Sequence, residues 1–152
     1  MRVCCDTSFL FSLYGRDTFT PAALAAALVL AKAPSLSPFN EYEFLNAVRL
    51  ACFRGAIGGE QAAAMLEDFG ADMAAGRLTP ETASLTAILE EAKRLSAKHT
   101  QTNGHRAFDI LHVAAAVTMK ADAFLSFDLN QRQLAKAAGL KVFPQAIPKP
   151  GK

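Results

Sequence analysis

The sequence predicts an α/β fold with a mostly parallel sheet. Short apolar segments that favour strands alternate along the chain with longer segments of helical periodicity, a pattern typical of parallel sheets covered by helices. With 152 residues, the chain is long enough to bury a core without disulfides or a structural metal. We therefore expect one domain over residues 1–146 and a flexible C-terminal tail over residues 147–152.

The first predicted strand is "MRVCC", and it ends at Asp6, where "TSFLFSLY" begins a helix. A second helix is expected over residues 20–33, because Thr20 suits an N-cap and Pro21 suits the first helical position. The first acidic residue of the chain therefore follows a buried strand directly.

The next predicted unit is "SLSPF", a short strand or extended segment, followed by a helix over residues 40–54 with Asn40 as its cap. The remaining predicted elements are, in order, a helix over 61–75, a turn or minor strand over 77–83, a helix over 84–98, a polar loop over 98–105, a helix over 105–117, a strand over 121–128, a helix over 130–139 and a strand over 140–144.

Composition and charge narrow the functional classes. A net charge of +2 is too small to demonstrate a nucleic-acid partner, although a localised basic patch is compatible with it. Cys4, Cys5 and Cys52 form no C-x-x-C pair, so we expect free thiols in a reducing compartment. The strongly apolar segment 22–33 is too short to span a bilayer and no signal peptide precedes it, which predicts a cytoplasmic protein without a membrane partner.

One carboxylate stands in an unusual place. Asp109 interrupts the apolar run "HRAFDILHVAAAV", in the first turn of its predicted helix. A carboxylate moved into an apolar interior costs several kcal/mol unless it is paired, protonated or bound to a metal. Asp6 and Asp128 follow predicted strands, and Glu43 lies near the start of the helix after "SLSPF". Since ligand sites of open α/β sheets lie outside the carboxyl ends of the strands, these acids can share one edge.

Four carboxylates in one cleft repel each other and raise each other's pKa values unless cations neutralise them. Mg²⁺ and Mn²⁺ prefer such oxygen ligands, and an ion held there can activate water to attack a phosphate ester. The pattern thus favours metal-dependent phosphoester hydrolysis. The sequence offers no serine–histidine–acid triad, P-loop or G-x-G-x-x-G as a competing site.

Four blocks carry a resemblance to a known family. The segments "VCCDTSFL", "LSPFNEYEFLNAVR", "HRAFDILHVAAAV" and "DAFLSFDLNQRQLAKAAGLKV" resemble the successive motifs of PIN-domain ribonucleases, and the chain is similar to the small bacterial toxins of the VapC type. The resemblance covers nearly the whole chain. It implies a three-layer α/β/α PIN-like fold and Mg²⁺- or Mn²⁺-dependent cleavage of RNA.

The resemblance also implies site residues. The catalytic and metal-binding acids it indicates are Asp6, Glu43, Asp109 and Asp128, with Thr7, Ser8, Ser126 and Asn130 in support. Glu41 is a rival for the second position. A helix turns about 200° in two residues, so both glutamates cannot face the cleft, and the match favours Glu43.

Ordinary structural roles remain open for the same acids. Asp6 and Asp128 could each cap the helix that follows, and Glu43 could pair with Arg49 on an exposed helix face. Capping and metal binding are compatible at a helix start.

Asp109 could pair with Arg106, three residues earlier, or leave that arginine free to contact an RNA phosphate. His112 is expected to be a hydrogen-bonded packing residue, because an oxygen-rich Mg²⁺ site needs no imidazole. Other basic residues near the motifs that could contact phosphate are Arg16, Arg49, Arg54, Arg132 and Lys136.

The leading functional hypothesis is a ribonuclease toxin, inhibited by a cognate antitoxin that covers the acidic cleft; toxins of this kind are commonly homodimers. The alternative is a catalytically silent PIN-like module that binds nucleic acid or protein. A phosphatase that uses an aspartyl phosphate is disfavoured, because it expects a second aspartate where this chain has Ser8.

Overall fold

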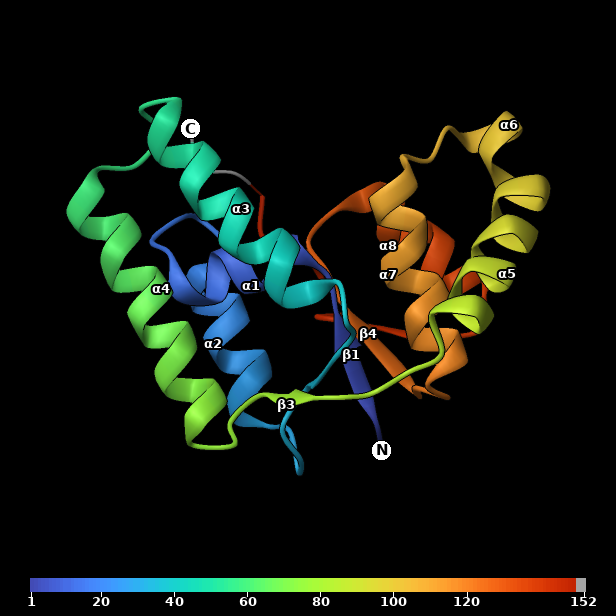
Figure 1. Cartoon of the computed structure of the whole chain (residues 1–152), viewed down its shortest axis with the longest axis horizontal. Helices are drawn as coiled ribbons and strands as arrows, with labels where there is room; N and C mark the ends of the chain where they lie inside the picture. The colour runs from blue at the N-terminus through green and yellow to red at the C-terminus, as the bar shows by residue number, and fades with distance from the viewer. Residues whose placement is uncertain (150–152) are drawn as a thin grey trace.

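A computed structural model describes residues 1–149 and shows a five-stranded sheet between two layers of helices (Figure 1). The strands are β1 (Val3–Cys5), β2 (Ser35–Leu36), β3 (Thr79–Pro80), β4 (Ala123–Leu125) and β5 (Lys141–Phe143). Their order is β3-β2-β1-β4-β5, and each neighbouring pair is parallel. The predicted three-layer α/β/α fold is confirmed, and segment 77–83 contains a minor strand.

The central strands β1 and β4 are buried on both faces, and their alternate residues supply two separate cores. Val3 and Cys5 of β1 belong to one hydrophobic cluster, whereas Cys4 between them belongs to the other. In β4, Phe124 shares the cluster of Cys4. Successive side chains of a strand point to opposite faces of the sheet. The neighbouring Cys4 and Cys5 therefore lie in different cores, and they form no disulfide.

The helices divide between the two faces of the sheet (Figure 1). The first core is covered by α1 (Thr7–Tyr14), α2 (Thr20–Leu28), α3 (Asn40–Phe53) and α4 (Gly59–Ala74). The second core is covered by α5 (Leu85–Leu95), α7 (Ala107–Thr118) and α8 (Leu129–Ala137). Within residues 1–149, none of the helices combines the length and apolar character needed to cross a membrane.

The predicted start and end of the second helix are wrong. Phe19 occupies the N-cap of α2, and Thr20 is its first residue. The Thr20 hydroxyl instead accepts a hydrogen bond from the backbone N–H of Asp17 and donates one to the carbonyl of Ser12, which ties α2 to α1. The helix ends at Leu28, before the predicted residue 33, in a tight turn.

The predicted polar loop over 98–105 is also wrong. The chain continues from α5 through a π-helical turn (Ser96–Thr100) into α6 (Gln101–Asn103), and it stops at Gly104, whose φ of 69° suits glycine. An exposed helical extension needs no apolar periodicity, so the polar composition was misleading. The tail prediction stays a prediction, because residues 150–152 lie outside the described residues, although Ile147 packs against the first core.

Candidate active site

The four predicted acids lie around one edge of the sheet, where β1 and β4 end side by side. In the sheet, β2 lies on one side of β1 and β4 on the other. The strand order therefore reverses between β1 and β4, which makes their shared edge a topological switch point. The backbone N–H of Asp6 donates to the carbonyl of Leu125, the last residue of β4. Glu43, Asp109 and Asp128 reach this edge from the first turn of α3, the first turn of α7 and the N-cap of α8.

Asp6 is fully buried, and both of its oxygens accept hydrogen bonds. Oδ1 accepts from the backbone N–H of Phe9 (2.9 Å) and from the Ser8 hydroxyl (2.7 Å), and Oδ2 accepts from the Ser126 hydroxyl. Burial raises the pKa of Asp6 to about 6, although these bonds and the nearby His112 oppose the rise. Asp6 therefore caps α1 and also forms the buried floor of the site.

Glu43 is held by residues from two other elements. Its Oε1 accepts from the hydroxyl of Thr7 and lies 2.9 Å from Nε2 of His112, whose side chain is buried. Nδ1 of His112 lies 3.5 Å from Nδ2 of Asn40, and that amide donates to the carbonyl of Cys5. Because Nδ1 faces a donor, the proton of a neutral His112 belongs on Nε2, where it can donate to Glu43.

The electrostatics and partners of Glu43 distinguish it from Glu41. Burial on its own would raise the pKa of Glu43, but the hydrogen bond and charge of His112, with smaller help from Thr7, hold that pKa below its ordinary value. Its partner is His112 rather than Arg49. Glu41 is exposed, so the structure brings Glu43 to the site, as the match favoured.

Asn40 does not cap α3, contrary to the sequence prediction. Phe39 is the N-cap and makes no side-chain cap bond. The Asn40 side chain is buried beneath the helix start, and its Oδ1 accepts from the backbone N–H of Ser37. The Asn40 side chain instead links α3 to β1, because its amide donates to the carbonyl of Cys5.

Asp109 and Asp128 are joined through one residue, Gln131, whose side chain bonds to the first and whose backbone bonds to the second. Asp109 accepts from Nε of Arg106 (3.2 Å) and from the amide of Gln131 (3.2 Å). Asp128 caps α8 by accepting from the backbone N–H of the same Gln131 (2.9 Å), and its own N–H donates to the Ser126 hydroxyl. The predicted Asp109–Arg106 pair and the predicted Asp128 cap are both present.

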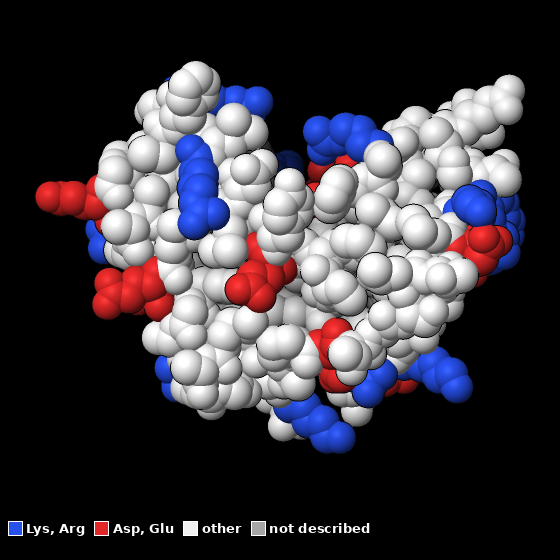
Figure 2. All heavy atoms as spheres, in the orientation of Figure 1, with Lys and Arg blue, Asp and Glu red and all other residues white. Residues whose placement is uncertain are grey.

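Two adjoining cavities are lined by three of the four acids, and the buried Asp6 is joined to them through the Ser8 hydroxyl, which lines the second cavity. One, of about 500 Å³ between α3 and α7, is lined by Glu43 and Asp109 among others; the second, of about 420 Å³, is lined by Asp128. Thr7 and Ala47 line both. Figure 2 shows a notch in the surface between the half of the molecule that carries α3 and the half that carries α7, and positive side chains are scattered around the edge of this face.

The donor chemistry of this edge fits a hard divalent cation, because the four acids and their supporting hydroxyls present oxygen. The side chains of these acids lie farther apart, however, than the ligands of one metal ion would. Among residues 1–149, no group of three or more His, Cys, Asp or Glu side chains is close enough to hold a metal ion. Asp109 is engaged by Arg106 and Gln131, so binding an ion would require these contacts to loosen.

Comparison with models of known protein families shows which family the chain belongs to. A family model of the PIN domain matches residues 3–137. The chain belongs to the PIN domain family. PIN domains are generally nucleases, so membership supports a nuclease, and the likeness to VapC-type proteins noted in the motifs extends to their fold. A comparison with curated protein sequences finds no match.

Solved structures with the same PIN fold cover nearly the whole chain. VapC20 of Mycobacterium tuberculosis, a sarcin-ricin loop cleaving toxin, has a TM-score of 0.68 and 18% identity, over 96% of this chain and 99% of its own. FitAcB from Neisseria gonorrhoeae has a TM-score of 0.64 and 19% identity, over 93% and 96%. A toxin–antitoxin complex from Klebsiella pneumoniae has a TM-score of 0.58 and 15% identity, over 84% and 87%.

Other predicted residues contact this PIN site indirectly. Asn130 donates to the carbonyl of Gly104 (2.6 Å), so it ties the start of α8 to the turn before α7. Arg132 is buried and donates to the carbonyl of Ser126, which removes it from the candidate phosphate contacts. His105 is buried as well, and neither ring nitrogen has a hydrogen-bond partner among the described residues; burial, then the charge of His99, lowers its pKa.

Sequence reasoning missed three supporting residues of the PIN site. Gln131 had a detectable signal, since an acid followed three residues later by Gln resembles a capping box. His112 was correctly expected to be hydrogen bonded, but its bond to Glu43 was not foreseen. The distant contacts of Asn40 carried no local sign, because Cys5 lies on β1 and His112 on α7.

Proposed function

We propose that the protein is a Mg²⁺- or Mn²⁺-dependent endoribonuclease that hydrolyses RNA phosphodiester bonds, and that it is the toxin of a toxin–antitoxin pair. The observation that carries the proposal is the placement of four acids at one edge of the sheet of a PIN domain. Glu43, Asp109 and Asp128 line two adjoining cavities there, and Asp6 is buried beside them. The proposal includes a cytoplasmic location, which the free cysteine thiols support.

The residues that would hold the metal are Asp6, Glu43, Asp109 and Asp128. A bound divalent ion supplies an activated water and neutralises the charge that develops on the phosphate. The chain's own residues prepare the site before any ion arrives: Ser8 and Ser126 orient Asp6, and Thr7 and His112 orient Glu43. The exposed Arg106 guanidinium can contact a backbone phosphate once it leaves Asp109.

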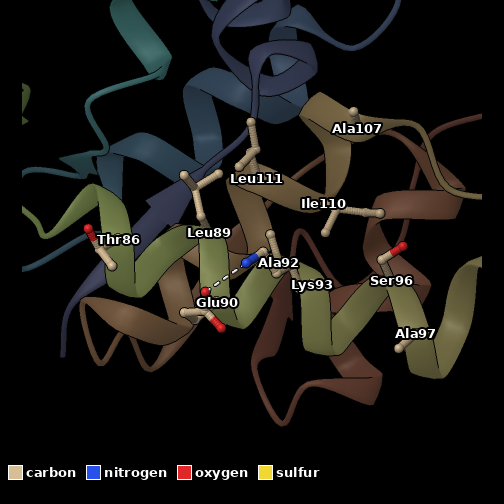
Figure 3. Close-up of a pocket in the computed structure, with 10 residues that line it drawn as sticks. All are labelled: Thr86, Leu89, Glu90, Ala92, Lys93, Ser96, Ala97, Ala107, Ile110 and Leu111. Atoms are coloured by element: carbon tan, nitrogen blue, oxygen red, sulfur yellow. Dashed lines mark hydrogen bonds and ion pairs between the residues drawn. The ribbon is translucent and has the colours of Figure 1, made fainter.

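An antitoxin and a second copy of the chain are the proposed protein partners. The toxin–antitoxin complex from Klebsiella pneumoniae supports the first. Two cavities that none of the four acids line offer apolar surface for such contacts. One, of about 610 Å³ between α5 and α7, is lined by Leu89, Ile110 and Leu111 (Figure 3), and the other, of about 660 Å³, includes Leu24 and Leu28 of α2. Size-exclusion chromatography of Leu24→Ser and Leu89→Ser variants, alone and with the antitoxin, tests these two surfaces.

The decisive experiment is a cleavage assay on single-stranded RNA with wild type, Asp6→Asn and Asp109→Asn, in Mg²⁺ or Mn²⁺ and in EDTA. Glu41→Gln is the matched control, because it removes an exposed acid from the same helix as Glu43. We expect each aspartate variant to lose about a hundredfold or more of the activity, EDTA to abolish it and the control to retain it. A wild type that cuts no RNA with either ion, beside an active reference nuclease, contradicts the proposal.

A second candidate is a catalytically silent PIN module, and one observation favours it: among the described residues, no three acids are close enough to hold an ion. Thermal unfolding with Mn²⁺ separates the two. A ligand that binds the native state raises the melting temperature by mass action, so a ribonuclease gains stability and an Asp6→Asn plus Asp109→Asn variant does not. Equal melting shifts in both proteins, or none, support the silent module.

A further inference from the structure

The cavity between α3 and α7 has the composition of a nucleotide subsite. Its volume of about 500 Å³ lies in the range of small-molecule pockets. Glu43 and Asp109 lie on its wall, and Arg106 supplies positive charge among the lining residues. Phe108 contributes an aromatic wall next to Asp109. An apolar ring, a cation and the proposed metal ligands thus border one space.

Phe108 is both accessible and held in place. It is 38% exposed, so part of its ring is open to solvent. Its ring centroid lies 6.3 Å from Phe39 at an interplanar angle of 86°, and 6.5 Å from Tyr42 at 32°. It also lies 6.4 Å from the His112 ring, which holds Glu43. The cluster fixes the ring while leaving part of it open.

The rings that line the second cavity are less exposed than Phe108: Phe11 and Phe19 are half-buried and Phe127 is buried. Phe127 is buried there, and it stacks between Phe9 at 5.8 Å and Phe19 at 5.0 Å, with interplanar angles of 18° and 15°. Its faces are therefore occupied by other aromatic rings. Phe108 is therefore the most exposed of the rings that line the two cavities, and the one best placed to receive another flat ring.

We propose that Phe108 forms a base-binding subsite for single-stranded RNA, in which a nucleobase stacks on the ring while Arg106 contacts the adjoining phosphate. The inference rests on the proposed ribonuclease function and adds to it the residue that selects an unpaired base. Stacking suits this position because every base has a flat face and a duplex base is unavailable to it. Arg106 has 83% of its side chain exposed, which gives it the freedom to follow the RNA backbone.

The test compares Phe108→Ala and Phe108→Trp with wild type on short single-stranded oligoribonucleotides. Binding is measured in EDTA by fluorescence anisotropy, and KM and kcat are measured in Mg²⁺. Phe53→Ala is the matched control, because Phe53 is 88% exposed on α3 and does not line the cavity. We expect Phe108→Ala to weaken binding and raise KM about ten- to a hundredfold with little change in kcat, Phe108→Trp to keep tight binding, and the control to match wild type.

An abasic scan of the oligonucleotide identifies the contact itself. Removing one particular base should weaken binding to wild type, and the same removal should have no further effect on Phe108→Ala, because both changes delete one interaction. Melting temperatures confirm that the variants are folded.

Three results overturn the subsite. In the first, a folded Phe108→Ala variant binds and cleaves RNA as well as wild type does. In the second, the effects of the variant and of the abasic sites on binding are additive. In the third, the Phe108→Ala variant has a lower molecular mass than wild type on size exclusion but binds RNA equally well. The last result assigns the ring to an interface between copies. If wild type cleaves no RNA, the proposed function fails instead, so the two failures are distinguishable.

Discussion

The four acids form two pairs that differ in what holds them. Asp6 and Glu43 accept hydrogen bonds across the fold: Ser126 lies 120 residues from Asp6, and His112 lies 69 residues from Glu43. Asp109 and Asp128 depend more on neighbours in their own helices, Arg106 and the backbone of Gln131, each three residues away.

The difference indicates that the two pairs of acids have different roles in the site. Tertiary hydrogen bonds fix Asp6 and Glu43 only when the sheet and three helices are in place, so this pair is organised by folding itself. The partner Arg106 of Asp109 is largely exposed and can move without disturbing a core. We expect the first pair to set the stability and rigidity of the site, and the second to adjust to the ion and substrate.

The largest effect is expected at Asp6, through pH. Burial raises its pKa from 3.8 to about 6, so between these values the folded protein keeps a proton that the unfolded chain releases. The free energy of unfolding therefore falls as pH rises through this window. A shift of about two pKa units corresponds to roughly 3 kcal/mol. Asparagine cannot titrate, so Asp6→Asn should gain about this much relative to wild type between about pH 4 and about pH 7.

Urea unfolding in EDTA at the two pH values measures the effect. Parallel pH dependence in the two proteins would show that Asp6 does not titrate in this window. Adding Mg²⁺ should reduce the difference, because a cation beside the carboxylate favours its charged form.

The next effect concerns the hydrogen bond between His112 and Glu43. His112→Leu removes the donor and leaves Glu43 without its partner on α7, and loss of a residue that orients a metal ligand typically costs about ten- to a hundredfold in activity or metal affinity. His112→Gln can place an amide N–H near the position of Nε2 and should recover part of the loss. Cleavage rates at graded Mg²⁺ concentrations test this, and equal losses in both variants would assign His112 to packing alone.

The sequence revealed the acids more readily than their supports. Asp6 and Asp128 are visible because each follows an apolar strand, and Asp109 because it interrupts an apolar run; these are local signals. The bond from His112 to Glu43 joins α7 to α3 and has no local signature. Thr20 was misplaced for the same reason, since its hydroxyl bonds to Ser12 on the preceding helix. The α/β class and the parallel sheet followed from the alternation of strands and helices, and the three layers from the resemblance, whereas the strand order and the contacts between distant elements carried no local signal.

A smaller effect is expected at Asp128. Its carboxylate caps α8, and loss of such a cap costs about 1 kcal/mol. Asp128→Ala should therefore lower the free energy of unfolding by about that amount, whereas Asp128→Asn, which still caps, should lose activity with little loss of stability. Denaturant unfolding beside cleavage assays separates the two roles. If Asp128→Asn keeps full activity, Asp128 is a cap and no more.

The smallest effect on stability is expected at Arg106. Exposed ion pairs contribute roughly 0 to 1 kcal/mol, so Arg106→Gln should leave the free energy of unfolding nearly unchanged. Its effect on RNA should be larger, because a guanidinium that contacts phosphate adds to the salt dependence of binding. Binding measured in EDTA over a range of salt concentrations should show a shallower slope for Arg106→Gln than for wild type. Arg94→Gln is the control, because Arg94 forms an ion pair of the same i,i+3 spacing with Glu91 on α5. Equal slopes would place Arg106 with Asp109 as a fixed local pair, and the contrast between a rigid and an adjustable half of the site would then not hold.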